Sequence, residues 1–211
     1  LLTDLGFVQV SKAGWEADDI LGTLAAACEA AGGTTLLATG DRDSLQLVDD
    51  ATTVLLATNK ETIPMDPAAI REKYGIEPPQ LIDVKSLMGD ASDNIPGVPG
   101  IGEKTAMQLL HDFGTLEGVY ANIEDERIKK GARTKLQNGE QSAKDSYWLA
   151  TIDRSVPLDL DVEHLPAQDI DETALYDLLT RLEFKNFIKR FDLSGESVSA
   201  PRLPELKTER A

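Results

Sequence analysis

The sequence has little of several residue types, and each shortage excludes a class of protein. Cys28 is the only cysteine in 211 residues, so a disulfide within the chain is excluded and a thiolate metal site is implausible. There is no run of about 18 apolar residues that would span a membrane. The chain does not open on a basic segment followed by an apolar run, so no signal peptide is predicted. These absences favour a cytoplasmic globular protein with one large domain or two small ones.

Basic residues are also scarce. The chain has 21 Lys and Arg against 37 Asp and Glu, a formal net charge of −16. This balance argues against nucleic-acid binding, because affinity for nucleic acid comes largely from neutralising phosphates. The charge is uneven, however. Residues 1–90 contain 15 acids and 6 basic residues, whereas residues 127–139 contain only basic charges: Arg127, Lys129, Lys130, Arg133 and Lys135. We interpret this basic stretch as a phosphate-contacting loop and helix, with a solvated helix face as the alternative.

The acids form three clusters, each at the end of an apolar element. Taken singly, they are explained by acids at a helix N-terminus, by an ordinary turn or by solvated side chains. Taken together, they suggest convergence at one place, where divalent cations would have to neutralise the repulsion. One cluster opens a helix, one follows a strand at the end where open α/β sheets bind ligands, and one precedes a glycine-rich turn. The candidate metal ligands are Glu16, Asp18, Asp19, Asp41, Asp43, Asp90 and Asp93.

The glycine-rich turn follows the last acidic cluster without a spacer. Gly97, Gly100 and Gly102 alternate with prolines, and a helix is predicted to begin near Glu103. Consecutive backbone N–H groups at a helix N-terminus favour a phosphate. Lys104 and Thr105 could add a charged or a hydroxyl contact. By itself the turn is compatible with a surface loop, but beside carboxylates it suggests phosphodiester cleavage.

The order of elements predicts an α/β layer followed by a helical module. Strands are expected at 35–39 and 53–56, among helices at 17–31, 43–47 and from Pro67. Beyond residue 78 we predict only helices, at 79–88, 103–113, 116–122, 127–137, 140–152, 172–182 and 185–190. The expected domains are 1–84, an α/β layer with a parallel sheet, and 85–193, an all-helical region; the family resemblance described next implies that the first is catalytic and the second binds DNA. Residues 194–211 have the composition of a disordered linker.

Several segments resemble the 5′-nuclease domain of bacterial DNA polymerase I, within the flap endonuclease superfamily. They include Glu16–Ile20 (EADDI), Thr39–Val48 (TGDRDSLQLV) and Leu182–Phe187 (LEFKNF). The resemblance covers nearly all of residues 1–193. It implies a PIN-like nuclease layer and a helix-hairpin-helix module, joined through the linker to a polymerase region.

The resemblance also implies roles for the site residues. The seven acids would hold two divalent cations, Mg²⁺ or Mn²⁺, with Asp41, Asp43, Asp90 and Asp93 as the catalytic set. One ion would activate a water and the other would stabilise the leaving 3′-oxygen. Backbone carbonyls around Val98 and Gly100 would hold a monovalent cation such as K⁺. The implied DNA contacts are Gly97, Val98, Gly100, Gly102, Lys104, Thr105, Lys129, Lys130, Arg133 and Lys135.

The implied task is removal of 5′ flaps and RNA primers from nicked or gapped duplexes, by a monomer in the bacterial cytoplasm at the nucleoid. One departure from the family pattern is the absence, before Glu16, of its opening strands with two metal-binding acids and of its basic arch. Two other readings stay open: a catalytically dead fragment that only binds duplex DNA, and a nuclease of this fold acting on RNA. The hairpin argues against the RNA reading, because its grip suits a duplex backbone.

A local departure lies at Tyr147 and Trp148, where relatives usually carry a basic residue. The indole could stack on a base or sugar. We nevertheless expect Trp148 in the core, because it lies at helical spacing from Leu149 and Ile152.

Overall fold

The computed structural model describes residues 1–162 and 169–194. Contacts divide the chain into two compact units. One comprises Ser11–Glu163, and the other joins Leu1–Val10 to the residues from His164 onward. Apart from residue 194, the predicted linker (194–211) lies outside the described residues.

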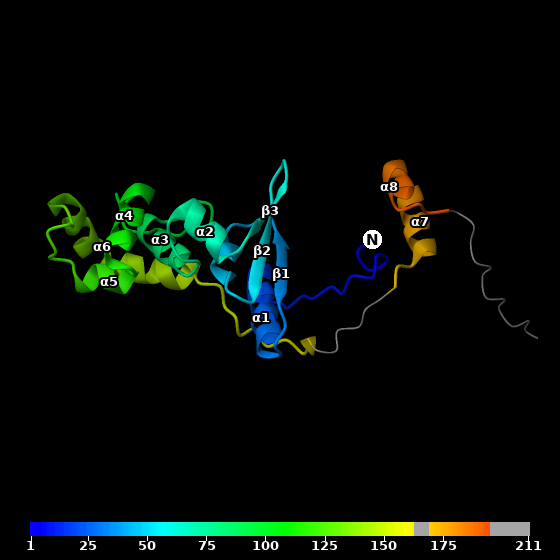
Figure 1. Ribbon diagram of the computed structural model, residues 1–211, viewed down its shortest axis with the longest axis horizontal. Coiled ribbons are helices and arrows are strands. Elements are labelled where there is room, and N and C mark those ends of the chain that lie inside the picture. The colour runs from blue at the N-terminus through cyan, green and yellow to red at the C-terminus, as the bar shows by residue number, and fades with distance from the viewer. Residues whose placement is uncertain (163–168, 195–211) are drawn as a thin grey trace, which may run out of the picture. The chain divides into compact units, whose positions relative to one another are not determined.

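The first part of the larger unit is a small mixed sheet (Figure 1). Strand β1 (Thr35–Thr39) pairs in parallel with β2 (Thr52–Ala57), which pairs antiparallel with β3 (Thr62–Met65). The α/β layer is thus confirmed. The sheet is not purely parallel, because β3, a strand that the sequence did not predict, pairs antiparallel with β2. Its residue Pro64 disfavours a strand, and the sheet tolerates it because β3 is an edge strand.

Helices complete this layer. They are α1 (Ala17–Ala30), the short 3-10 helix η1 (Asp43–Leu47) and α2 (Pro67–Tyr74). Side chains of β2 alternate between buried and partly exposed, as expected for a strand with one face on a core. The core of the layer contains Leu37, Leu45, Val54, Leu56, Met65 and Ile70.

The helical module follows, with α3 (Gln80–Met88), α4 (Glu103–Phe113), α5 (Leu116–Ala121) and α6 (Lys130–Ala150) around a second core. The two helices predicted at 127–137 and 140–152 are one helix, because α6 runs unbroken through Asn138 and Gly139.

Gly139 is retained within α6 because of a contact with a residue distant in sequence. A Cβ added to Gly139 would lie 2.8 Å from Val98 Cγ1, so glycine lets α6 approach the turn before α4.

The smaller unit contains α7 (Glu172–Arg181) and α8 (Lys185–Arg190). Asp171 caps α7 by accepting a hydrogen bond from Ala174 N at 2.9 Å. Leu175 and Leu179 are buried, whereas Phe184, Phe187 and Phe191 stay partly exposed. No described helix of either unit is both long and apolar enough to cross a membrane.

Candidate metal centre and nucleic-acid interface

Three of the predicted metal ligands converge. One carboxylate oxygen each from Asp43, Asp90 and Asp93 lies within 4.8 Å of the others. Asp43 begins η1, shortly after β1 ends, whereas Asp90 and Asp93 follow α3. Gly89 makes this possible because its φ is +76° and an added Cβ would lie 2.8 Å from the carbonyl oxygens of Ile95 and Pro96. Two parts of the chain distant in sequence therefore bring carboxylates to one point.

Lys85, in the last turn of α3, lies among these carboxylates, and sequence reasoning missed it. Its ammonium is 2.9 Å from Asp90 Oδ2 and 3.1 Å from Asp93 Oδ2, and it also contacts Asp43. The available signal was its isolation, since Lys85 is the only basic residue between Lys73 and Lys104.

The electrostatics of this cluster follow from burial and from Lys85. Burial opposes the charge on Lys85, but hydrogen bonds to the three carboxylates raise its pKa. Burial raises the pKa of Asp43 despite its bond to Lys85. Hydrogen bonds from Ser92 and then Lys85 lower the pKa of Asp90 to about 2. Three carboxylates and one ammonium leave a formal charge of −2, which one divalent cation would neutralise.

The acids of the first cluster share a cavity with two members of this triad. The cavity, of about 640 Å³, is lined by Glu16, Asp18, Asp19, Asp43 and Asp93, among other residues. Glu16 caps α1, and Asp19 accepts hydrogen bonds from Glu16 N at 3.2 Å and Asp153 N at 2.8 Å. Burial, followed by the charges of Asp19 and Glu16, raises the pKa of Asp18. The first acidic cluster and two members of the triad thus line one cavity.

Asp41 lies close to the triad but is not one of its three converging carboxylates. It is exposed and, among the described residues, belongs neither to the triad nor to the cavity lining. Its Oδ1 instead accepts a hydrogen bond of 2.9 Å from Asp43 N, which orders the turn after β1. After burial, the charge of Asp41 is among the causes that raise the pKa of Asp43, so Asp41 lies close to the triad and its role as a metal ligand stays a prediction.

One face of α6 holds the glycine-rich turn. Ser142 Oγ donates to Gly97 O at 2.6 Å, and Gly97 N donates to Ser146 Oγ at 2.9 Å. Lys135 Nζ donates to Gly100 O at 2.8 Å. The α6 residues at 135, 139, 142 and 146 recur at helical spacing, so a single face contacts the turn along its length.

Lys135 contacts a carbonyl that was expected to help hold a monovalent cation. The Gly100 carbonyl accepts a hydrogen bond from the Lys135 ammonium, and the cation stays a prediction. The Val98 carbonyl accepts a hydrogen bond from Ile101 N at 3.0 Å, and the Val98 side chain is buried. Lys135 is therefore a support of the turn. Gly102 caps α4, and Lys104 is exposed in its first turn, where it is free to meet an anion.

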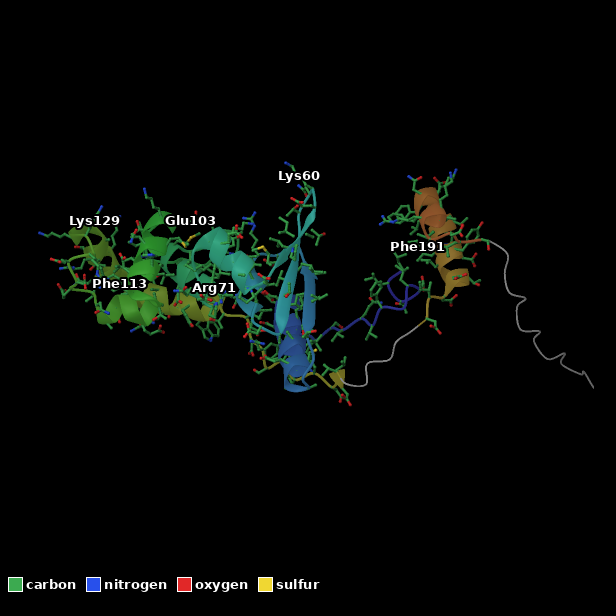
Figure 2. The ribbon with its side chains drawn as sticks, in the orientation of Figure 1. Lys60, Arg71, Glu103, Phe113, Lys129 and Phe191 are labelled. Atoms are coloured by element: carbon green, nitrogen blue, oxygen red, sulfur yellow. The ribbon has the colours of Figure 1, made fainter. Side chains whose placement is uncertain are left out.

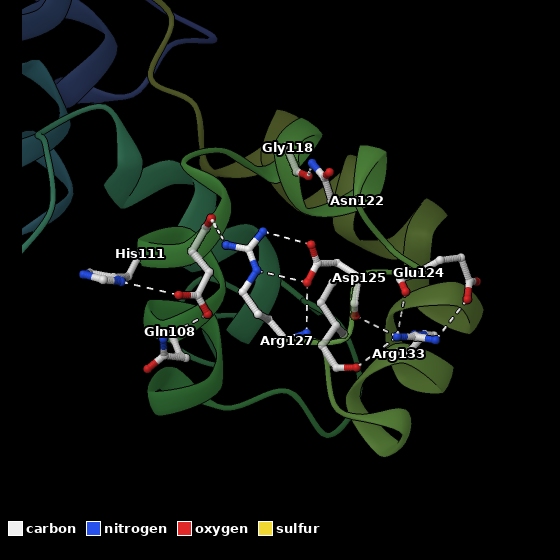
Figure 3. A network of polar contacts seen from close by, with 10 residues as sticks. Gln108, His111, Gly118, Asn122, Glu124, Asp125, Arg127 and Arg133 are labelled. Carbon is white, nitrogen blue, oxygen red and sulfur yellow. Dashed lines mark hydrogen bonds and ion pairs between the residues drawn. The ribbon is translucent and has the colours of Figure 1, made fainter.

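Two of the five cations in the basic stretch pair with neighbouring acids (Figure 3). Arg127 pairs with Asp125 at 2.9 Å and donates to the Asp112 carbonyl at 3.1 Å. Arg133 pairs with Glu124 at 3.0 Å and donates to three backbone carbonyls. Both acids lie immediately before the stretch in the sequence.

Two cations of this stretch remain available. Among residues 1–162 and 169–194, Lys129 and Lys130 form no ion pair. Figure 2 shows the side chain of Lys129 extending outward at the end of the helical module. The basic patch is therefore smaller than predicted.

The expectation that Trp148 belongs to the core is wrong. Its side chain is 77% exposed, and it lines the same cavity as the acids. The neighbouring Tyr147 packs against the helical core instead. The helical spacing identified the right helix but assigned the wrong one of two adjacent aromatics to its buried face.

The chain matches two consecutive family models. Residues 1–75 match the 5′-3′ exonuclease N-terminal resolvase-like domain, and residues 76–173 match the 5′-3′ exonuclease C-terminal SAM fold. DNA polymerase I of Bacillus caldotenax is 42% identical over 189 residues, covering 89% of this chain and 21% of the relative. DNA polymerase I of Pseudomonas aeruginosa is 40% identical over 210 residues, covering 97% and 23% respectively. The chain thus spans about a fifth of the length of these relatives.

Solved structures share the fold. T5 5′-exonuclease with bound divalent metal ions (zinc) superposes with a TM-score of 0.61 at 24% identity, covering 72% of this chain and 55% of that one. The catalytic core of Rad2 in complex with DNA substrate gives a TM-score of 0.61 at 20% identity, covering 92% and 66%.

Proposed function

Because the chain belongs to the 5′-3′ exonuclease family, we propose that it provides a metal-dependent site for hydrolysing phosphodiester bonds at 5′ flaps and RNA primers. The observation that carries this proposal is the convergence of Asp43, Asp90 and Asp93 around the ammonium of Lys85. A nuclease needs concentrated negative charge to hold cations and a nearby means of holding a phosphate. The carboxylate triad and the glycine-rich turn, the candidates for these two roles, both belong to the unit Ser11–Glu163.

The donor set fits Mg²⁺ or Mn²⁺. All the candidate ligands are carboxylate oxygens, which these hard cations prefer. Lys85 already places one positive charge among three carboxylates, so the triad is built around a cation. Glu16, Asp18 and Asp19, in the same cavity, are the candidates for holding a second ion. When bound, such ions activate water and stabilise a leaving oxygen. Lys85 offsets the repulsion between the carboxylates and orients them.

The glycine-rich turn would hold the substrate. We infer that the backbone N–H groups at the start of α4 contact a backbone phosphate of nicked, gapped or 5′-flap duplex DNA. Lys104, Lys129 and Lys130 would add charge without reading sequence. A monomer is sufficient for this contact, since α6 of the same chain fixes the turn.

A second candidate function is duplex binding without cleavage. The contacts that hold the turn come from α6 and do not involve the carboxylates of the triad. The turn can therefore keep its conformation whether or not the acidic site is active.

Cleavage and binding assays on the 211-residue chain separate these candidates. A fluorescent 5′-flap duplex and a matched RNA duplex are incubated with Mg²⁺ or Mn²⁺, and binding is followed by anisotropy with Ca²⁺. We expect flap cleavage that Asp90→Ala abolishes while Kd changes by less than about threefold, because a metal ligand acts mainly on the transition state. The exposed Asp50→Asn serves as a control with unchanged activity.

Each other outcome has a definite meaning. Flap binding without cleavage supports the binding-only module. Equal cleavage by wild type and Asp90→Ala contradicts the assigned site. Preferential cleavage of the RNA duplex supports the RNA nuclease, and failure to bind any of the duplexes overturns all three functions.

A further inference from the structure

Both tryptophans of the chain line the acidic cavity. The sequence contains two, Trp15 and Trp148, and each contributes to the lining together with the carboxylates of Asp43 and Asp93. Trp15 directly precedes the helix-capping Glu16, and Trp148 lies in the last turn of α6. The least common large aromatic in this chain is thus concentrated at one place.

Trp148 is not required by the fold around it. In the same turn of α6, Ser146 and Ala150 are buried and Tyr147 packs against the helical core. The Trp148 side chain is left 77% exposed. An indole so exposed gains little from packing within the chain, although it offers a large flat apolar face. Its position indicates a role in contacting something that enters the cavity.

The chemistry of the cavity narrows what that partner is. The acids repel an anionic strand except where cations neutralise its phosphate. A nucleobase is uncharged, and each base has a π-face that stacks on an aromatic side chain without a sequence requirement. A nucleotide whose phosphate lies at the carboxylate site can therefore place its base on an indole at the wall of the same cavity.

We propose that Trp148 stacks on a nucleobase adjacent to the phosphodiester that is cleaved. Trp148 is then a positioning residue that fixes where the strand lies relative to Asp43 and Asp93, with Trp15 as a second aromatic wall. This inference rests on the proposed nuclease function, because it requires a DNA strand in the cavity.

Binding measurements test the stacking. Anisotropy titrations of a 5′-flap duplex with Ca²⁺ compare wild type, Trp148→Ala and Trp148→Phe. We expect Kd to rise about 5- to 100-fold for Trp148→Ala and to recover largely for Trp148→Phe, since one stacked base accounts for such a factor. Leu36→Ala is the matched control, because Leu36 is a 69% exposed apolar residue that does not line the cavity, and its Kd should not change.

Abasic DNA shows whether a base is the partner. A series of flap duplexes carries one abasic site at each of the nucleotides flanking the junction. At one position the abasic site should weaken wild type and leave Trp148→Ala unaffected, because both changes remove the same contact. In Trp15→Phe, which leaves Trp148 as the only indole, fluorescence should be quenched by the intact flap and not by that abasic one.

The outcomes distinguish failure of the stacking proposal from failure of the proposed nuclease function. If wild type binds the flap but Trp148→Ala binds equally well, stacking is overturned and the nuclease proposal stands. If Trp148→Ala loses the same factor on every abasic duplex, the role is structural and stacking is again overturned. If wild type binds no flap DNA, both proposals fail.

Discussion

The ammonium of Lys85 lies 2.9 Å from Asp90 Oδ2 and joins that carboxylate, which follows α3, to Asp43 at the start of η1. The Lys85 side chain is 17% exposed, so water screens the three carboxylates around it only in part. Without a cation, this lysine is what offsets their repulsion.

Lys85→Met should therefore destabilise the metal-free protein. We expect the free energy of unfolding in EDTA to fall by about 1–3 kcal/mol, because partly buried carboxylates lose their only positive partner among the described residues. Saturating Mn²⁺ should restore more stability in the variant than in wild type, because the ion binds a more negative site. Urea unfolding with and without Mn²⁺ measures both quantities. Lys60→Met, at an exposed lysine, is the control; a similar loss in both variants would contradict the prediction.

Two glycines of α6 should respond in opposite ways to alanine. Gly139→Ala places a Cβ 2.8 Å from Val98 Cγ1, and such overpacking costs about 1–3 kcal/mol. Gly131→Ala meets nothing within 4 Å and should stabilise by up to about 1 kcal/mol, because alanine favours a helix. Thermal and urea unfolding of the two variants provide the comparison. Stabilisation by both would mean that α6 does not press on the turn.

Lys104 and Lys135 should differ in how they affect DNA binding. Lys104→Met removes a charge at the start of α4, so the slope of log affinity against log salt should become shallower by about one unit or less. Lys135→Met should weaken binding by a similar factor at every salt concentration, because it releases Gly100 O and loosens the turn. In this variant the amides of Gly97, Val98, Gly100, Ile101 and Gly102 should also exchange faster with solvent. If Lys135→Met flattens the slope as Lys104→Met does, Lys135 contacts phosphate instead of supporting the turn.

Features with a local cause were predictable from the sequence. Pro67 after Asp66 marked the start of α2, and the Asp66 side chain accepts from Ala69 N as a helix cap does. The acids at 16–19, 43 and 90–93 could be identified as candidates because each ends or begins an apolar element. The confirmed family and α/β-plus-helical architecture rest on such local patterns.

Features with a distant cause were not predictable. The continuity of α6 through Gly139 depends on Val98, which is far away in sequence. Lys85 meets Asp43 only after α3 packs against η1, so no spacing rule relates the two residues. The charge count at 127–139 treated Arg127 as available, although Asp125, just outside that window, neutralises it. In each case the missing information was the partner in space.

Asp83 predicts how stability varies with pH. This residue of α3 is 5% exposed, and its Oδ1 accepts a hydrogen bond of 3.0 Å from Leu116 N at the start of α5. Burial raises its pKa to about 6, although the bond from Leu116 opposes the shift. The folded protein therefore binds the proton more tightly than the unfolded chain, whose value is near 3.8. As pH rises from about 4 through 6, this residue's contribution to stability must fall, by on the order of 3 kcal/mol in total.

Asp83→Asn isolates that contribution. The amide oxygen can still accept the hydrogen bond from Leu116 N, but the side chain no longer titrates. We expect the difference in unfolding free energy, variant minus wild type, to increase between pH 4 and pH 7 and to level off above the folded pKa. Urea unfolding at half-unit pH steps gives this difference directly, and other acids cancel because both proteins share them. A difference that is flat from pH 4 to pH 7 would show that Asp83 is ionised in the folded protein throughout, with the Leu116 N–H fully compensating its burial.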